Sequence, residues 1–252
     1  MALVTGGGRG IGQAISLALG RAGAAVAVNW RRDEESATKT LSLLEEMGAR
    51  AIIVQGSIDD YARHASLVAE VEEQLGPIGI LVHNGGVGSR GDLVIDTDVA
   101  DVERLFRVHG AGPHSLTRHV LPGMRTQERG DIVMISSVAA HVLTPGGGPY
   151  NMAKAALEAL AHTLSKEEID HGIRVNIVAP GFVATEMGDR LIRGLSKGEV
   201  ADASEPGASE IMGHVCQPEE IADAVTFFVS PQSGYITGQK LIVDGGSYPH
   251  RP

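Results

Sequence analysis

The sequence contains a single cysteine, Cys216, among 252 residues. One thiol excludes an internal disulfide framework and leaves no cysteine cluster for zinc, which suits a reducing compartment. We expect Cys216 to behave as a small buried hydrophobe. No apolar run approaches the ~20 residues of a membrane span, and the start MALVTGGG lacks the basic region of a signal peptide. These absences predict a cytoplasmic protein without a membrane partner.

Basic charge is also scarce, because 21 Lys and Arg residues face 31 Asp and Glu residues and give a net charge of −10. This balance argues against a nucleic-acid-binding surface. Aromatic residues make up only 4% of the chain, whereas glycine supplies 33 of 252 residues, nearly double the usual ~7%. The glycine content predicts many tight turns and close backbone approaches.

Apolar runs of strand length alternate with helical patterns along the whole chain. The expected strands cover residues 2–5, 26–29, 51–55, 80–83, 132–135, 174–178 and 240–243. Helical patterns cover residues 11–22, 33–47, 59–75, 99–127, 151–164 and 218–229, with glycines and a proline interrupting the fourth. Continuous apolar strands are typical of a parallel sheet covered on both faces. The alternation predicts an α/β fold, a Rossmann-type doubly wound sheet of about seven strands. No linker divides residues 1–252, so we expect one domain.

The first strand leads straight into the glycine-rich turn GGGRGIG, and a helix follows. Such a turn lets the backbone approach a pyrophosphate, which the N-terminus of the helix then binds. The spacing is Gly6-x-x-x-Gly10-x-Gly12, not G-x-G-x-x-G, because position 11 is isoleucine. The setting of strand, turn and helix therefore carries the prediction of a dinucleotide site.

Two serines and a tyrosine–lysine pair form the candidate catalytic site. Ser136 and Ser137 end an apolar strand, and Tyr150 and Lys154 lie four residues apart on a predicted helix, so that both side chains leave from one face. An unperturbed tyrosine has a pKa of about 10. A neighbouring lysine favours the phenolate and should bring that pKa nearer the working range. Taken alone, the same residues could be a helix cap and a solvated helix face.

Taken together, these motifs resemble the short-chain dehydrogenase/reductase family, and in particular its 3-oxoacyl-[acyl-carrier-protein] reductase-like members. The resemblance covers residues 1–248. It rests on six motifs in order, which are Thr5-Gly6-x-x-x-Gly10-Ile11-Gly12, Asn84-Gly85-Gly86, Ser137, Tyr150-x-x-x-Lys154, Pro180-Gly181-Phe182-Val183-x-Thr185 and Gly238-x-x-x-x-Val243-Asp244-Gly245-Gly246. The second motif differs from the family's Asn-Ala-Gly by one Ala→Gly change.

The resemblance implies a role for each matching residue. Tyr150 would give or take the substrate hydroxyl proton, Ser137 would hydrogen-bond the substrate oxygen, and Lys154 would hold the nicotinamide ribose and lower the pKa of Tyr150. The candidate cofactor-binding residues are Gly6, Gly8, Arg9, Gly10, Ile11, Trp30, Arg31, Arg32, Ser57, Ile58, Asn84, Gly85, Gly86, Tyr150, Lys154, Pro180, Gly181, Val183 and Thr185. Ser57 stands where the family often has an aspartate that contacts adenine.

A fourth catalytic position departs from the family. Where the family has an asparagine in its fourth helix, this chain has His109. The family uses the main-chain carbonyl there, so a side-chain change need not abolish activity. We expect a modified proton relay that uses the imidazole. The alternatives are that His109 fills space or that activity is lost. His109, His114 and His119 diverge around a helix, so no metal site is expected.

Cofactor choice depends on the end of the second strand. An NAD site places a carboxylate there, whereas this chain has Trp30 followed by Arg31 and Arg32, with Arg9 nearby. Arginines bind a 2′-phosphate well, and Asp33 reads as the N-cap of the next helix. We therefore predict NADP(H), with NAD as the alternative because Asp33 could still reach the ribose.

Residues 182–216 form a long segment dotted with apolar side chains. A segment of this length is usually functional or mobile, so it is a candidate cover for the substrate; a surface hairpin used in oligomerisation is the alternative. By family analogy we expect a homotetramer, or a homodimer, and the run 153–164 fits a packed helix interface.

Three functions are compatible with these features. The first is an NADP(H)-dependent carbonyl reductase or alcohol dehydrogenase acting on a small molecule. The second is an NAD-dependent alcohol or polyol dehydrogenase. The third, from another class, is a dinucleotide-binding sensor or scaffold with impaired catalysis, which His109 would favour and the Ser–Tyr–Lys set opposes.

Overall fold

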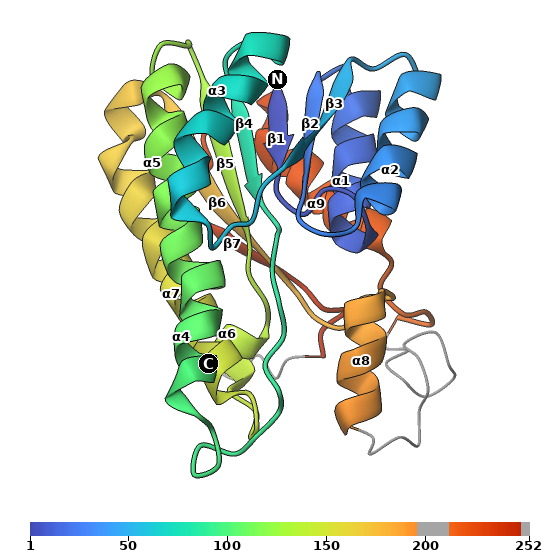
Figure 1. Ribbon diagram of the computed structural model, residues 1–252, viewed down its shortest axis with the longest axis vertical. Helices are drawn as coiled ribbons and strands as arrows, with labels where there is room; N and C mark the ends of the chain where they lie inside the picture. The colour runs from blue at the N-terminus through green and yellow to red at the C-terminus, as the bar shows by residue number, and fades with distance from the viewer. Residues whose placement is uncertain (196–211, 248–252) are drawn as a thin grey trace.

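A computed structural model of the chain describes residues 1–195 and 212–247. Its centre is a seven-stranded parallel sheet with the order β3-β2-β1-β4-β5-β6-β7 (Figure 1). The strands are β1 (Ala2–Val4), β2 (Val26–Trp30), β3 (Ala51–Gln55), β4 (Ile80–His83), β5 (Gly130–Ile135), β6 (Ile173–Pro180) and β7 (Lys240–Val243). The predicted doubly wound parallel sheet is confirmed.

Helices cover both faces of this sheet. The α-helices are α1 (Gly10–Arg21), α2 (Glu34–Glu46), α3 (His64–Leu75), α4 (Val99–Phe106), α5 (Gly112–Met124), α6 (Ala139–Val142), α7 (Gly148–Glu167), α8 (Glu186–Leu195) and α9 (Pro218–Val229). One apolar core lies under α3, α5 and α7, and a second lies under α1, α2 and α9 (Figure 1). None of the helices in the described ranges combines enough length and apolar character to cross a bilayer.

Local sequence signals fix several helix starts. The Asp33 carboxylate accepts a hydrogen bond from the Ser36 N–H at 3.0 Å and caps α2 as predicted. Helix α9 begins with Pro218, whose missing N–H costs nothing in a first turn. The Glu220 carboxylate accepts from the Gln217 N–H at 2.8 Å and completes a capping box. These caps explain why the bounds of both helices were readable from the sequence.

Three elements differ from their predicted form. The third helix begins late, since Tyr61–Arg63 is a 3₁₀ turn and α3 starts at His64. The short helix α6 lies in the connection between β5 and α7, where no helix was predicted. The predicted interruption between residues 99 and 127 is a π-helical turn, Arg107–Ala111, which joins α4 to α5 without ending the helix. Pro113 follows this turn and has no N–H to donate, which accounts for the local departure from regular α-helical hydrogen bonding.

Two side chains have surroundings that the sequence did not indicate. His64 is fully buried, and its Nδ1 lies 3.0 Å from the Ser115 hydroxyl. Burial lowers the pKa of His64, and it lowers that of the neighbouring buried His83 to about 3. The two buried imidazoles therefore act as neutral parts of the core. Cys216, expected to be buried, is partly exposed.

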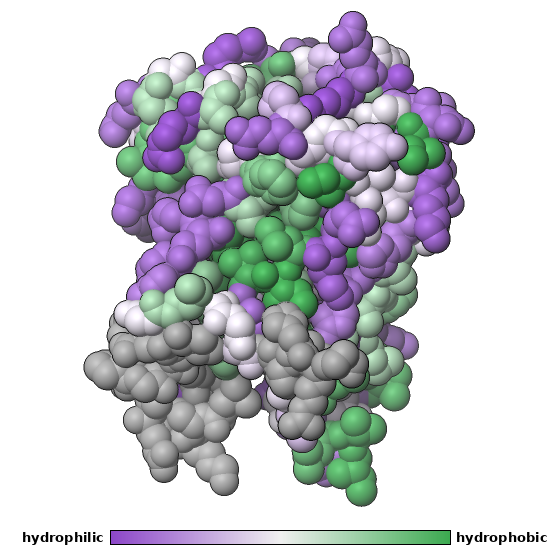
Figure 2. Space-filling view, turned by 180° about the vertical axis from the view of Figure 1, so that it is seen from behind, coloured by the Kyte–Doolittle hydropathy of each residue, from purple (hydrophilic) through white to green (hydrophobic). Residues whose placement is uncertain are grey.

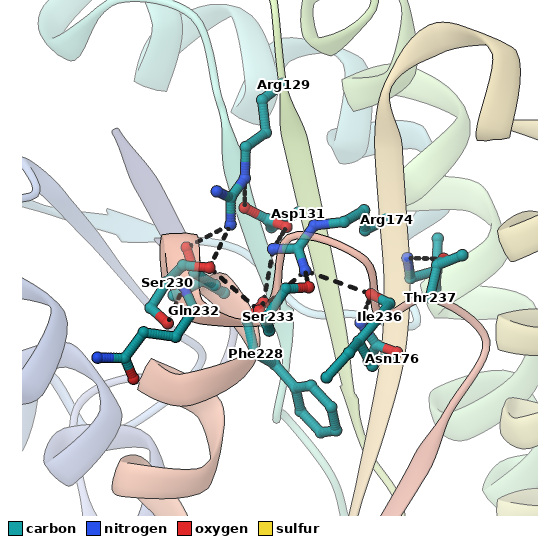
Figure 3. Close-up of polar contacts among 12 residues, drawn as sticks. Arg129, Asp131, Arg174, Asn176, Phe228, Ser230, Gln232, Ser233, Ile236 and Thr237 are labelled. Carbon is teal, nitrogen blue, oxygen red and sulfur yellow. Dashed lines mark hydrogen bonds and ion pairs between the residues drawn. The ribbon is translucent and has the colours of Figure 1, made fainter.

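A buried ionic network fastens α9 to the amino-terminal ends of β5 and β6 (Figure 3). The Asp131 carboxylate accepts hydrogen bonds from Arg174 and, at 2.9 Å, from Arg129. Arg174 donates to the Phe228 carbonyl at 2.7 Å and to the Ser233 hydroxyl at 2.8 Å. The network therefore joins the sheet to the last turn of α9 and the 3₁₀ turn Pro231–Ser233 that follows it.

Burial dominates the energetics of this network. It raises the pKa of Asp131, although the guanidinium groups of Arg174 and Arg129 act in the opposite direction. A buried ion pair recovers its desolvation cost only while both partners are present. Removing Asp131 alone would leave the Arg174 guanidinium buried beside carbonyl groups that satisfy only part of its charge.

We expect Asp131→Asn to lower the free energy of unfolding by roughly 3–5 kcal/mol, because it leaves a buried charge unpaired. Chemical denaturation measures the change directly. Glu128→Gln removes an exposed carboxylate three residues away and should change stability by no more than about 0.5 kcal/mol. An Asp131→Asn protein as stable as this control would contradict the assigned role of the network.

Candidate functional site

The carboxyl ends of neighbouring parallel strands bring the predicted motifs together. β1 lies beside β4, and β4 lies beside β5, in parallel register. The glycine turn after β1, Asn84 after β4 and Ser137 after β5 therefore lie along one edge of the sheet, the lower edge in Figure 1. This edge is also the one toward which α6 and α8 lie. Ligands of open α/β sheets bind in this position.

The turn after β1 is shaped for close backbone approach. Gly6 and Gly10 have positive φ angles of 59° and 51°, which favour glycine. A Cβ added at Gly6 would lie 2.9 Å from the Gly85 Cα, and one at Gly8 would lie 3.0 Å from the backbone of Ala37. A Cβ at Gly12 would overlap the Gly6 carbonyl oxygen. Larger residues at these positions would close the turn.

Helix α1 presents an open N-terminus at this turn. Its N-cap, Arg9, makes no side-chain hydrogen bond to the helix, and the first turn contains no acidic residue. Unpaired N–H groups and the positive end of the helix dipole favour a bound anion. The glycine turn and the α1 N-terminus therefore fit the pyrophosphate of a dinucleotide.

Asn84 joins the two loops at the centre of the edge. Its side-chain amide donates to the carbonyl oxygens of Thr5 and Gly6, at 3.0 and 3.1 Å. The Thr5 hydroxyl in turn accepts from the N–H groups of Asn84 and Gly85, both at 2.9 Å. In this structure Asn84 holds the glycine turn against the loop after β4, and Gly85 and Gly86 follow it on that loop.

The residues predicted near the adenine end lie after β2 and β3. Trp30 ends β2 and is partly buried, while Arg31 and Arg32 are exposed. Ile58 is buried, with 8% of its surface exposed, and a Cβ added at Gly85 would lie 3.3 Å from it. The Ser57 hydroxyl donates to the Asp59 carboxylate. Ile58 thus packs against the loop that carries Gly85.

The segment after β6 returns to the glycine turn. The Gly181 N–H donates to the Val243 carbonyl at 2.9 Å, and Val183 pairs with Cys216 in an isolated bridge. The Thr185 hydroxyl accepts from the Gly188 N–H at 3.1 Å and caps α8. A Cβ added at Gly10 would lie 3.3 Å from the Thr185 methyl group. Pro180 to Thr185 therefore connects the sheet edge to α8.

An ion pair also holds α8 on this turn. The Arg9 guanidinium lies 2.7 Å from the Glu186 carboxylate and 3.7 Å from that of Asp33. Both partners of the shorter pair are more than half exposed, so this ion pair contributes little to stability. The pair places α8, which lies within residues 182–216, beside the predicted dinucleotide site; residues 196–211 of that segment lie outside the described ranges.

Tyr150, Lys154 and Ser137 lie close together near the carboxyl end of β5. Helix α7 places the Lys154 Nζ 5.6 Å from the centroid of the Tyr150 ring, on the same helix face, as predicted. Lys154 is buried, and its Nζ donates to the Ile135 carbonyl at 2.7 Å. The Tyr150 hydroxyl is within hydrogen-bonding reach of the Ser137 side chain. The three side chains are therefore arranged as a proton-transfer group.

The electrostatic balance of this group differs from expectation. Burial raises the pKa of Tyr150 to about 12, against the Ser137 hydrogen bond. Burial also lowers the pKa of Lys154 to about 7, although the nearby Glu158 raises it. The predicted lowering of the Tyr150 pKa is therefore not present in the free protein. The physical reason is that Lys154 is itself desolvated and carries only part of its charge near neutrality.

His109 lies against the same tyrosine from the π-helical turn. Its ring centroid is 5.4 Å from that of Tyr150, with the planes at 85°, and its Nε2 lies 2.8 Å from the Val87 carbonyl. Burial, with a smaller contribution from the Lys154 charge, lowers the pKa of His109 to about 3. The imidazole is neutral at physiological pH and bound to the main chain, which argues against the expected imidazole relay.

Sequence reasoning missed a polar cluster behind Lys154. The Glu158 carboxylate accepts from the Ser136 hydroxyl at 2.7 Å and lies 3.3 Å from the Lys240 Nζ and 3.1 Å from the His141 ring. The only signal in the sequence was a carboxylate one helical turn after Lys154. Lys240 and His141 are distant in the sequence, and no spacing rule links them to α7.

Comparison with known proteins identifies the family. The family model described as enoyl-(acyl carrier protein) reductase matches residues 6–248. The chain belongs to the short-chain dehydrogenase/reductase family. The relatives and structural neighbours that it matches are oxidoreductases, and this chain is an enzyme of that class. The family resemblance inferred from the six motifs is thereby confirmed.

Individual relatives extend over nearly the whole chain. A 3-oxoacyl-[acyl-carrier-protein] reductase of Synechocystis sp. is 34% identical over 248 residues, 98% of this chain and 96% of its own. Acetoin dehydrogenase YohF from Salmonella typhimurium is 30% identical with a TM-score of 0.85, and the match covers 98% and 95% of the two chains. Carveol dehydrogenase from Mycobacterium avium, solved in complex with NAD, is 26% identical with a TM-score of 0.89, covering 98% and 96%.

The site contains no grouping suited to a metal. Within residues 1–195 and 212–247, no three His, Cys, Asp or Glu side chains lie close enough to hold an ion. The described part of the chain has backbone groups suited to a dinucleotide and side chains suited to proton transfer.

We predict that His109 does not titrate between pH 5 and pH 8, because its pKa is lowered to about 3 by burial. Imidazole ¹⁵N NMR across this range should show a constant neutral ring for His109. The exposed His162 is the control imidazole in the same spectra. A midpoint for His109 above about 5 would restore the imidazole relay.

Proposed function

We propose that this enzyme is an NADP(H)-dependent oxidoreductase that interconverts a ketone or aldehyde and an alcohol, with Tyr150 as the general acid and base. The observation that carries the proposal is the meeting of Tyr150, Lys154 and Ser137 beside the glycine turn. When bound, the nicotinamide supplies or accepts the hydride. The chain's own part is to position the reactants and to move one proton at the Tyr150 hydroxyl.

The residues divide into three roles. Tyr150 gives its proton to the substrate oxygen during reduction and takes it back during oxidation. Ser137 hydrogen-bonds that oxygen. Lys154 would hold the nicotinamide ribose, and its ammonium, when charged, favours the Tyr150 phenolate. His109 acts here as a neutral neighbour that fixes the Tyr150 ring and the main chain at Val87.

The dinucleotide contacts follow from the edge of the sheet. Gly6, Gly8, Gly10 and Ile11 would hold the pyrophosphate, and Trp30, Ser57 and Ile58 would border the adenine. Asn84, with Gly85 and Gly86, would support the adenine ribose region. Pro180, Gly181, Val183 and Thr185 would border the nicotinamide. The position of these residues after the carboxyl ends of the parallel strands supports this assignment.

Arg31 and Arg32 support the choice of NADP(H), together with Arg9. Both follow β2 and are exposed, and the Asp33 carboxylate is occupied as the α2 cap. A carboxylate committed to Ser36 is poorly placed for a ribose 2′-hydroxyl, whereas the exposed guanidinium groups of Arg31 and Arg32 suit a 2′-phosphate.

An Arg31→Ala protein should therefore bind NADPH about tenfold more weakly, from the loss of one charge-assisted contact, while NADH affinity stays unchanged. Fluorescence titration with each cofactor measures both constants. Arg21→Ala, at the exposed far end of α1, is the matched control and should leave both unchanged. NADH binding as tight as NADPH binding in the unaltered protein would replace NADP(H) with NAD.

Tyr150→Phe should reduce turnover about 10²–10⁴-fold, because it removes the proton donor, while NADPH still binds. Turnover is followed at 340 nm with a panel that includes a 3-oxoacyl thioester, acetoin and a cyclic ketone. Tyr235→Phe alters a fully exposed phenol and is the control. Turnover by Tyr150→Phe equal to that of the control would refute the assignment of Tyr150.

Two other functions have a specific observation in their favour. An NAD-dependent alcohol or polyol dehydrogenase is favoured by the carveol dehydrogenase relative, which was solved with NAD. A dinucleotide-binding sensor without turnover is favoured by the neutral His109 in the position of the family's asparagine. Cofactor binding with no turnover across the panel would select the sensor.

We further propose that residues 1–252 form one domain, that residues 182–216 cover the substrate, and that the protein assembles as a cytoplasmic homotetramer or homodimer. Figure 2 shows an apolar patch on the back face, over β7 and α9. Phe227 on α9 and Leu241 on β7 are 39% and 40% exposed, and β7 is an edge strand. Exposed apolar edges of this kind favour association. Leu121 and Leu160 line a second groove, between α5 and α7.

A further inference from the structure

The cluster around Glu158 is a feature that the proposed mechanism does not use. Glu158 lies on α7 one helical turn after Lys154 and is only 7% exposed. Its carboxylate accepts a hydrogen bond from Ser136, the residue directly before Ser137. A buried carboxylate is costly unless it is paired and hydrogen-bonded. Its position next to the proton-transfer group requires an explanation.

The partners of Glu158 come from two other elements. Lys240 begins β7, and its Nζ lies 3.3 Å from the carboxylate. His141 lies on α6, with its Nε2 3.1 Å from the carboxylate, and its ring also contacts the Lys240 Nζ. In the described part of the chain, the ionisable groups that face Glu158 are Lys240 and His141, together with Lys154 from its own helix. The cluster therefore contains one negative charge between two lysines.

These charges act in opposite directions on Lys154. Lys154 donates its only side-chain hydrogen bond in the described structure to the neutral Ile135 carbonyl, so no carboxylate compensates its charge by direct contact. Glu158 raises the pKa of Lys154, which burial alone would lower further. The Lys240 ammonium, on the far side of Glu158, reduces this effect of Glu158 on the pKa of Lys154, because neighbouring charges are poorly screened from one another in the interior.

We propose that Glu158 is a positioning residue that keeps Lys154 charged, and that Lys240 opposes it from β7. This inference rests on the proposed function, in which a charged Lys154 favours the Tyr150 phenolate. His141 borders the carboxylate and the Lys240 ammonium, and it ties α6, which precedes the loop leading to Tyr150, to the same cluster.

The proposal predicts opposite effects from two substitutions. Glu158→Gln removes the negative charge and should lower the pKa of Lys154 by about one unit; Lys240→Gln removes the opposing positive charge and should raise it by about half a unit. In alcohol oxidation, which needs the Tyr150 phenolate, the apparent pKa of the rate should rise in the first variant and fall in the second. A purely structural role would damage both variants in the same direction.

The direct readout is ¹³Cε NMR of lysine-labelled protein, with the Lys154 signal assigned from Lys154→Met. The control is Glu167→Gln, which removes an exposed carboxylate from the same helix and should not move that signal. Shifts of opposite sign in the two variants support the proposal. Shifts of the same sign, or no shift in either variant, overturn it. If Glu158→Gln does not fold, the direction of the Lys240→Gln shift decides alone.

Failure of this inference is distinguishable from failure of the proposed function. The NMR titration needs no substrate, so it measures the Lys154 pKa even in a protein without turnover. Turnover that depends on Tyr150, combined with a Lys154 pKa that Glu158→Gln leaves unmoved, would remove the role of Glu158 and retain the enzyme. The pH dependence of the oxidation rate, measured with the best alcohol from the panel, then provides an independent check.

Discussion

The burial of Lys154 is the constraint on which the rest of the site depends. Its ammonium is almost fully removed from water and donates to the Ile135 carbonyl at the end of β5. That bond fixes α7 against the sheet edge and so places Tyr150 beside Ser137. The same burial lowers the pKa of Lys154 to about 7. Position and charge are therefore coupled, and a lysine held this firmly needs nearby groups that preserve its charge.

The loops at the carboxyl ends of the strands position the site, and an ionic network at the amino-terminal ends of β5 and β6 holds α9 on the sheet. Asn84 and Thr5 join the loops after β1 and β4 through four hydrogen bonds to main-chain groups. The Arg174–Asp131 network at the other end fastens α9 to β5 and β6. Rigid elements that end at one edge hold reactive groups within the narrow limits that proton and hydride transfer require.

Much of the fold was readable from the sequence because the signals were local. The bounds of β3, β4, α9 and β7 were predicted from apolar runs and helix caps, and the glycine turn and the Tyr150–Lys154 pair follow from spacing. What could not be read depends on tertiary environment. The burial of His64, the neutral state of His109 and the high pKa of Tyr150 all arise because segments distant in the sequence pack around these side chains. The contacts of Glu158 with Lys240 and His141 also join segments that are distant in the sequence.

The most direct test of this account is transfer of deuterium from NADPH labelled at nicotinamide C4 to a carbonyl substrate. The protein is mixed with each labelled C4 epimer and the carbonyl panel, and the alcohol product is analysed by mass spectrometry. The account predicts one deuterium on the carbinol carbon, from one epimer only, because the site fixes the face of the ring. Tight cofactor binding without deuterium transfer to any carbonyl would contradict it.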